Sequence, residues 1–182
     1  MSIEAFTYAK HMNLKLAANE LGMKWQTLYV SLKKQGIAVV GDKLRYGTDR
    51  DRLAAMAESE FMRLVPSAVD MNKTKFQAKF DFNVNGYKVD VKAATPRVGC
   101  NSGGGKRWAF SFKKQSLVCD FICCFCFNES KVLDRVLLVP SEFFSGLQSV
   151  SVSCSGVSKW LDYAVEQKEL EAFFNGLPRL EI

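Results

Sequence analysis

The chain has 182 residues, 48% of them hydrophobic and 24% charged, which suits one folded domain, or a domain with a small added module, and excludes a disordered protein. Its formal net charge is +6, and it contains no apolar run long enough to cross a bilayer and no N-terminal signal-peptide pattern. We therefore expect a cytoplasmic protein without a membrane partner.

Residues 12–46 are expected to form two short helices followed by a hairpin. Glycine allows a turn after each predicted helix, at Gly22 and Gly36. Residues 37–40 and 43–46 have the pattern of two short strands around a Gly-Asp turn. The apolar residues at helical spacing are Leu14, Ala17, Ala18, Leu21, Leu28 and Leu32.

This segment resembles a helix-turn-helix, and its hairpin would correspond to the wing of winged-helix proteins. In that motif the second helix enters the major groove of DNA. The resemblance implies a DNA-binding module over residues 1–47, with a plain helical hairpin as the alternative. We assign Trp25 and Tyr29 to its core in preference to stacking on bases. The expected DNA contacts are Lys24, Gln26, Thr27, Val30, Ser31, Lys34, Lys43 and Arg45.

A third helix is expected over residues 48–64, where Thr48 can cap the first turn and Pro66 follows the end. Two strands, 75–84 and 87–93, come next. They are joined by Asn85-Gly86, the strongest short hairpin signal in a sequence.

The hairpin register predicts which side chains lie opposite each other on the two strands. A two-residue turn pairs Val84 with Tyr87, so Asp81 is expected to face Asp90 directly. Like charges in that position are unfavourable, and a shared Mg²⁺ would compensate, because it prefers hard oxygen ligands. Lys92 lies on the same face, two residues after Asp90. The opposite face should supply core through Phe80, Phe82, Val84, Val89 and Val91.

Further strands are expected at 107–112, 121–127 and 135–139, with a Gly- and Ser-rich loop at 95–106. A closing amphipathic helix is expected over 158–175, with Trp160, Tyr163, Ala164, Leu170 and Phe174 facing inward. Four of the six cysteines crowd into the segment CDFICCFCF, where reduced thiols packed in a central strand are favoured over zinc ligands or disulfides.

Positive charge is concentrated near the predicted hairpin. Residues 73–114 contain ten Lys and Arg against two Asp, a net charge of +8, so the rest of the chain carries −2. Such a concentration is what binding to a phosphate backbone requires, and a solvated lysine-rich surface is the alternative.

The pattern of Asp81 followed by Asp90-Val91-Lys92 across a hairpin resembles the core of the PD-(D/E)XK nuclease superfamily. The resemblance implies an α/β domain over residues 48–182, with a restriction-endonuclease-like mixed central sheet flanked by helices. It also implies a third carboxylate on the preceding helix, for which Glu60 is the best match and Glu58 the rival. Asp81, Asp90 and Glu60 would bind Mg²⁺, with Mn²⁺ as a substitute, and Lys92 would be catalytic. Basic and polar residues near the scissile strand would be Lys106, Arg107, Lys113, Lys114 and Gln115.

These expectations lead to a magnesium-dependent endonuclease that cuts double-stranded DNA at specific sites. Enzymes of this construction occur in restriction systems, mobile elements and phages, which implies a bacterial or phage-infected cell. The alternatives are a structure-specific nuclease such as a junction resolvase or repair enzyme, a non-catalytic DNA-binding regulator, and an RNA-directed enzyme. The sequence leaves open whether the protein forms a homodimer to cut both strands.

Overall fold

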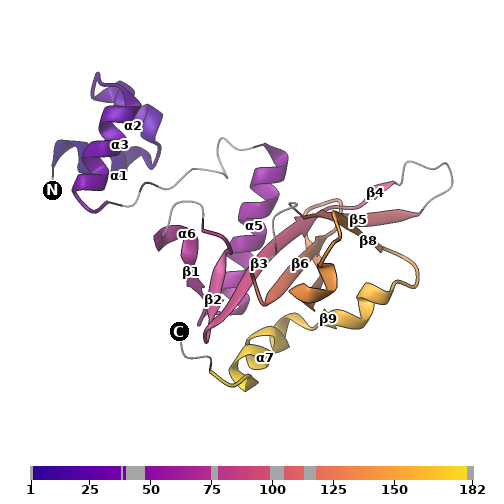
Figure 1. Cartoon of the computed structure of the whole chain (residues 1–182). Coiled ribbons are helices and arrows are strands. Elements are labelled where there is room, and N and C mark those ends of the chain that lie inside the picture. The colour runs from indigo at the N-terminus through magenta and orange to yellow at the C-terminus, as the bar shows by residue number, and fades with distance from the viewer. Residues whose placement is uncertain are drawn as a thin grey trace. The chain divides into compact units, whose positions relative to one another are not determined.

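A computed structural model describes residues 2–37, 39, 48–74, 78–98, 105–112 and 118–179 (Figure 1). The chain divides into two compact units, Met1–Arg52 and Leu53–Ile182. Within the described residues, no helix combines the length and the apolar character needed to cross a membrane.

The first unit is a set of three helices, α1 (Ile3–His11), α2 (Leu14–Glu20) and α3 (Trp25–Lys34). Side chains cap the first two, since Ser2 Oγ accepts the Ala5 N–H at 3.2 Å and Asn13 Oδ1 accepts the Leu16 N–H at 2.9 Å. Glycines in the left-handed region follow α2 and α3, as predicted. The small core consists of Ala5, Tyr8, Ala17, Ala18, Leu28 and Leu32.

Two features of this unit differ from the sequence expectations. Helix α1 was not predicted, because it buries only Ala5, Thr7 and Tyr8 and exposes Ile3 and Phe6, so its apolar residues do not mark one face. Trp25 was expected in the core but is 44% exposed, which makes that assignment wrong. The predicted wing, with Lys43 and Arg45, lies mainly outside the described residues.

The second unit is an α/β structure built on a mixed six-stranded sheet with the order β1-β2-β3-β6-β7-β9. Strands β3 and β6 are parallel, and all other neighbouring strands are antiparallel, so β2 and β7 run opposite to the remaining four. The strands are β1 (Val69–Asp70), β2 (Phe82–Val84), β3 (Tyr87–Ala94), β6 (Phe121–Phe127), β7 (Leu133–Pro140) and β9 (Ala164–Val165).

Helices α5 (Asp49–Leu64) and α7 (Leu170–Gly176) contribute to the core on one face of this sheet. Helix α5 begins as predicted: the Thr48 Oγ1 accepts the Asp51 N–H at 3.2 Å, and Asp51 Oδ2 accepts the Thr48 N–H at 2.9 Å. The centre of this core is Phe61, whose ring lies 4.8 Å from that of Phe82. Around it pack Leu53, Ala57, Val84, Val89, Val91, Phe125, Leu170 and Phe174.

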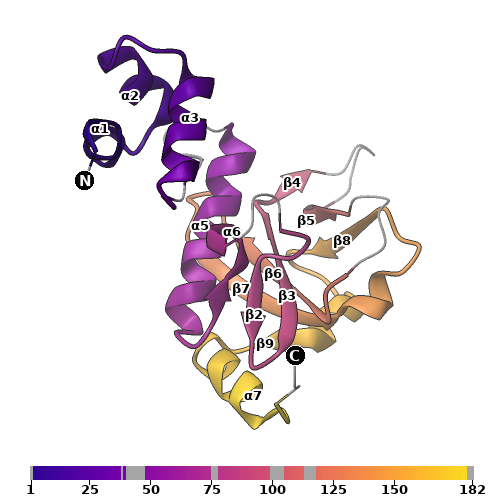
Figure 2. The same cartoon turned by 60° about the vertical axis from the view of Figure 1, so that its left-hand side comes forward.

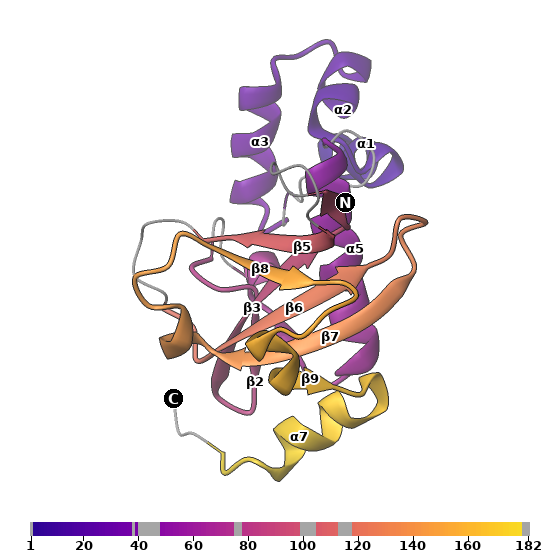
Figure 3. The ribbon, with the colours of Figure 1, turned by 90° about the vertical axis from the view of Figure 1, so that its right-hand side faces the viewer.

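A second, three-stranded sheet packs against the other face. It consists of β4 (Arg97–Val98), β5 (Lys106–Ser111) and β8 (Ser149–Ser153) in that order. In Figure 3, β5 and β8 lie in front of β6 and β7, and α5 lies behind them. The six-stranded sheet is therefore covered on both faces, which explains why β6 is buried along nearly its whole length.

The predicted closing helix over residues 158–175 is wrong. The segment forms two 3₁₀ turns, η2 (Lys159–Tyr163) and η3 (Gln167–Glu169), with β9 between them, and only its last part is helical. Strand β9 pairs with β7 through Val136 and Leu137, so the segment satisfies backbone groups of an edge strand that a helix would leave open. As a consequence Ala164 is exposed, whereas Trp160, Leu170 and Phe174 are buried as expected.

Other short elements were also absent from the sequence expectations. They are β1, β4, β8, the single helical turn α6 (Met71–Thr74) and the 3₁₀ turn η1 (Ser141–Phe144). The expected burial of these cysteines is confirmed: Cys119, Cys123, Cys124 and Cys126 are buried, three of them in β6.

Candidate active site

Strands β2 and β3 form a hairpin (Figure 2). Its first three residue pairs have the predicted register. Val84 pairs with Tyr87, and Phe82 pairs with Val89. The turn residues Asn85 and Gly86 have φ values of 54° and 94°, the left-handed conformation that a tight two-residue turn requires. The ladder ends at Phe82, so Asp81 and Asp90 are not paired in it as we expected.

Asp81 instead binds the backbone of β3. Its own N–H donates to the Val89 carbonyl at 3.1 Å, and its Oδ2 accepts the Val91 N–H at 2.8 Å. The carboxylate takes the place of the backbone carbonyl that a longer β2 would offer to Val91. This geometry also breaks the side-chain alternation, because Phe82 packs in the core beside α5, whereas Phe80 packs on the opposite face. The assignment of Phe80 to the same face as Phe82 is therefore wrong.

A second donor fixes the other oxygen of Asp81. Asn72 Nδ2 donates to Asp81 Oδ1 at 3.2 Å. Two hydrogen bonds keep Asn72 close to Asp81. The Asn72 N–H donates to Asp70 Oδ1 at 2.9 Å, and the Met71 N–H donates to the Asp81 carbonyl at 2.9 Å. The sequence analysis missed Asn72, because nothing in the sequence indicates that the single turn α6 lies beside the start of β2.

Asp90 and Lys92 form an ion pair on β3. The parallel pairing of β3 with β6 places Asp90 beside Ile122 and Lys92 beside Cys124, and both of these neighbours belong to the core under the second sheet. The side chains of Asp90 and Lys92 are only 17% and 30% exposed. The ion pair is therefore partly enclosed, and neither side chain is fully exposed to solvent.

The electrostatics connect all three residues. Burial by itself lowers the pKa of the Lys92 ammonium, but the adjacent Asp90 carboxylate raises it, Asp81 adds to this effect, and the pKa is raised overall. Burial and the nearby Asp90 charge also raise the pKa of the Cys119 thiol to about 11. The site is therefore a partly enclosed group of two carboxylates and one ammonium, with an unreactive thiol beside it.

The predicted third carboxylate, Glu60 on α5, is bound to an arginine of the same helix. Glu60 binds Arg63 through both oxygens, at 2.9 Å to Nε and 2.6 Å to Nη2, and this partner lowers the pKa of Glu60. Among the described residues, no group of three His, Cys, Asp or Glu side chains is arranged to hold a metal ion. The structure thus brings Asp81 and Asp90 to Lys92 without Glu60, and Glu58 is likewise not part of such a group.

Mg²⁺ nevertheless suits the donors that are present. It is commonly held in proteins by one or two carboxylates, with water and substrate phosphate completing its shell. Asp81 and Asp90 supply hard oxygen atoms of that kind, and the donors on Asp81 leave further lone pairs on both of its oxygens. The residues that fit the ion are these two aspartates.

The predicted DNA-binding residues fall into three groups. In the first unit, Lys24, Gln26, Thr27, Val30 and Lys34 are exposed, and Ser31 is half-buried with its Oγ accepting from Gln35 Nε2 at 3.2 Å. In the second unit, Lys106 and Arg107 are exposed on β5, but Lys106 is paired with Glu129. Lys113, Lys114 and Gln115 lie outside the described residues.

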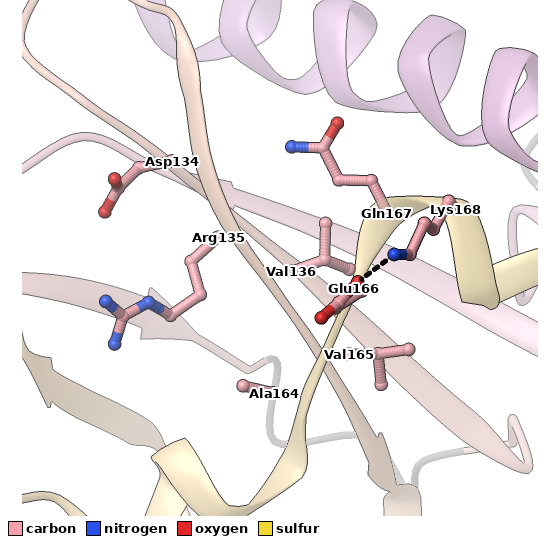
Figure 4. A pocket seen from close by; sticks show the side chains of 8 residues that line it. All are labelled: Asp134, Arg135, Val136, Ala164, Val165, Glu166, Gln167 and Lys168. Atoms are coloured by element: carbon pink, nitrogen blue, oxygen red, sulfur yellow. Dashed lines mark ion pairs between the residues drawn. The ribbon is translucent and has the colours of Figure 1, made fainter.

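An open pocket of about 500 Å³ lies elsewhere, along the pairing of β7 with β9 (Figure 4). Its charged side chains alternate in sign, with Asp134, Arg135, Glu166 and Lys168 at its wall, and Lys168 binds Glu166 at 2.9 Å. A pocket whose charges are balanced in this way has no excess charge with which to attract a phosphate. The β2–β3 group is the stronger candidate for chemistry.

No protein-family model and no curated protein matches the sequence.

Proposed function

We propose that this protein is a magnesium-dependent DNA endonuclease that hydrolyses phosphodiester bonds at the β2–β3 site. The observation that carries the proposal is the partly buried ion pair of Asp90 with Lys92, next to the Asp81 carboxylate. Removing two charges from water is costly, and a partly buried ion pair is weak evidence for stability, so a function for this pair is the better explanation.

Each residue has a role that follows from its chemistry. Asp81 and Asp90 would hold the ion through their oxygens, and Asn72 and the Val91 N–H would keep the Asp81 carboxylate in place. Lys92 would donate hydrogen bonds to the phosphate and stabilise the negative charge that develops on it. Mg²⁺, when bound, supplies positive charge that polarises the phosphate.

The helical unit supports duplex DNA as the substrate. Its α2–turn–α3 arrangement has the order of a helix-turn-helix, and the exposed side of α3 carries the polar and basic residues expected to contact DNA. We therefore propose that this unit binds the duplex and that recognition is sequence-specific.

The decisive test is cleavage of supercoiled plasmid by the full chain with Mg²⁺, with EDTA as the control. Asp90→Asn and Lys92→Ala should each reduce cleavage by at least about 100-fold, because the first removes a carboxylate charge that would hold Mg²⁺ and the second removes the ammonium that would stabilise the transition state. Binding to the same DNA, measured with Mg²⁺ left out, should stay within about threefold of the wild type, and the thermal midpoint of each variant shows whether it folds.

Two variants serve as matched controls. Lys88→Ala removes an exposed lysine from the same strand, two residues before Asp90, and Asp162→Asn removes an exposed carboxylate from the same unit. Both should cleave within about threefold of the wild type. If the Asp90 and Lys92 variants lose DNA binding in step with cleavage, the site is a binding surface and the assignment fails.

A DNA-binding protein without cleavage is the second candidate. The observation that favours it is Glu60, whose carboxylate is engaged by Arg63 and not grouped with the two aspartates. Wild-type protein that shifts DNA in a gel, yet leaves plasmid intact with both Mg²⁺ and Mn²⁺, would select this function.

A further inference from the structure

The outer side of α3 is basic and contains no acid. Lys33 and Lys34 lie in its last turn, Lys24 immediately precedes it, and none of its ten residues is Asp or Glu. Across residues 2–37 there are five lysines and two glutamates, and one of these glutamates, Glu20, is bound by Lys10 and His11. The other glutamate, Glu4, interacts with Ser31 and Gln35 at the end of this helix. With five lysines against two glutamates, the helical unit still carries a net positive charge, which is complementary to a phosphate backbone.

Gln26 and Val30 lie together in the middle of this exposed side. They are four residues apart, so their side chains are neighbours on one face, opposite the fully buried Leu28 and Leu32. Val30 is 50% exposed although it is apolar, and its neighbours on this face are polar or basic. An isolated valine beside a glutamine is unlike the continuous apolar stripe by which a helix docks on a protein groove.

We infer that Val30 is a specificity-determining residue that contacts the methyl group of a thymine in the major groove, beside an adenine read by Gln26. Glutamine pairs with the N6 and N7 edge of adenine, and small apolar groups contact the thymine C5 methyl. The lysines around them hold phosphates and so fix the helix in the groove without reading sequence. The recognition site therefore contains an A·T-rich step at which replacing thymine by uracil removes a contact.

This inference rests on the DNA binding in the proposed function, not on cleavage, and its test is done in EDTA. A randomised duplex library is enriched for binding to the full chain. The enriched duplex is then prepared with uracil in place of thymine, one position at a time. At one or two positions uracil should weaken binding about fivefold, the effect expected for losing one buried methyl group.

Two variants identify the residue. Val30→Ala should reduce the preference for thymine over uracil at the sensitive position, because it removes both Cγ methyl groups. Its thermal midpoint should stay near that of the wild type because Val30 is half-exposed. Lys34→Ala is the matched control on the same helix, and it should weaken binding to both duplexes by the same factor.

The outcomes separate this inference from the nuclease proposal. Failure to enrich any sequence, equal binding of thymine and uracil at every position, or an unchanged preference in Val30→Ala would overturn it. A Val30-dependent preference in a protein that does not cut DNA supports it and contradicts only the nuclease. Cleavage without any thymine preference contradicts only the role of Val30.

Discussion

The two faces of strand β3 differ in what they pack against and in what they can do. On one face Val89 and Val91 are buried with Phe82 and Phe61 beside α5. On the other face Asp90 and Lys92 form an ion pair at the border of the core under the second sheet. One strand thus supplies both hydrophobic stabilisation and a partly enclosed charged group. The packing of Val89 and Val91 holds the backbone of β3 in place, and the positions of Asp90 and Lys92 depend on that backbone.

The largest expected effect comes from breaking the apolar face. Phe61 is fully buried, and its ring lies 4.8 Å from Phe82, 6.5 Å from Phe125 and 6.2 Å from Phe174. Phe61→Ala should lower the free energy of unfolding by about 3–5 kcal/mol, because it removes apolar contacts and leaves a cavity. Denaturant unfolding measures this change. Phe143→Ala, at a ring that is 46% exposed, is the control and should lose less than about 1.5 kcal/mol; equal losses in the two variants would contradict the core described above.

A smaller effect is expected from loosening the charged face without touching the core. Asn72→Ala removes the side-chain donor to Asp81 Oδ1. The backbone N–H of Val91, which donates to Oδ2, remains. Metal affinity should fall about tenfold, since residues that orient a ligand commonly have effects of this size. Mn²⁺ binding followed by electron paramagnetic resonance gives the affinity directly.

The control for Asn72→Ala is Asn175→Ala, which removes an exposed amide from α7. It should leave Mn²⁺ affinity unchanged, and both variants should keep the thermal midpoint of the wild type because both side chains are exposed. Unchanged Mn²⁺ affinity in Asn72→Ala would show that Asn72 does not position Asp81 for a metal.

The smallest effect is expected at the turn that joins β2 to β3. Gly86 has φ 94°, where an added Cβ is strained, so Gly86→Ala should destabilise the protein by roughly 1 kcal/mol. The matched variant Gly176→Ala, at a helix end where a Cβ would meet nothing within 4 Å, should change stability by less than about 0.5 kcal/mol. Cleavage per folded molecule should stay the same in Gly86→Ala; a specific loss of cleavage would mean that the turn itself takes part in the reaction.

Local signals in the sequence predicted several parts of the site correctly. Asn85-Gly86 predicted the register from Val84 to Phe82, because only a narrow set of turns fits that dipeptide. Thr48 marked the start of α5, and the alternation of apolar residues around Asp90 and Lys92 predicted which face they share. These features depend on residues close together in the chain.

Contacts between distant segments were not predictable in the same way. The hydrogen bond from the Val91 N–H to Asp81 and the contact of Asn72 with Asp81 depend on where β2 ends and on where α6 is placed. Strand β9 was predicted as helix because Tyr163 and Ala164 fit a helical pattern, and the pairing of this segment with β7 overrode that pattern.

The sequence by itself determined the hairpin, the spacing of Asp90 and Lys92, the reduced cysteines in β6 and the concentration of positive charge, since each of these is a property of neighbouring residues or of composition. The tertiary structure decided that the ladder stops before Asp81, that the second sheet encloses the Asp90 face and that Trp25 is exposed. These outcomes depend on which distant segments pack together and which of them pair through backbone hydrogen bonds. A local sequence pattern carries little information about either.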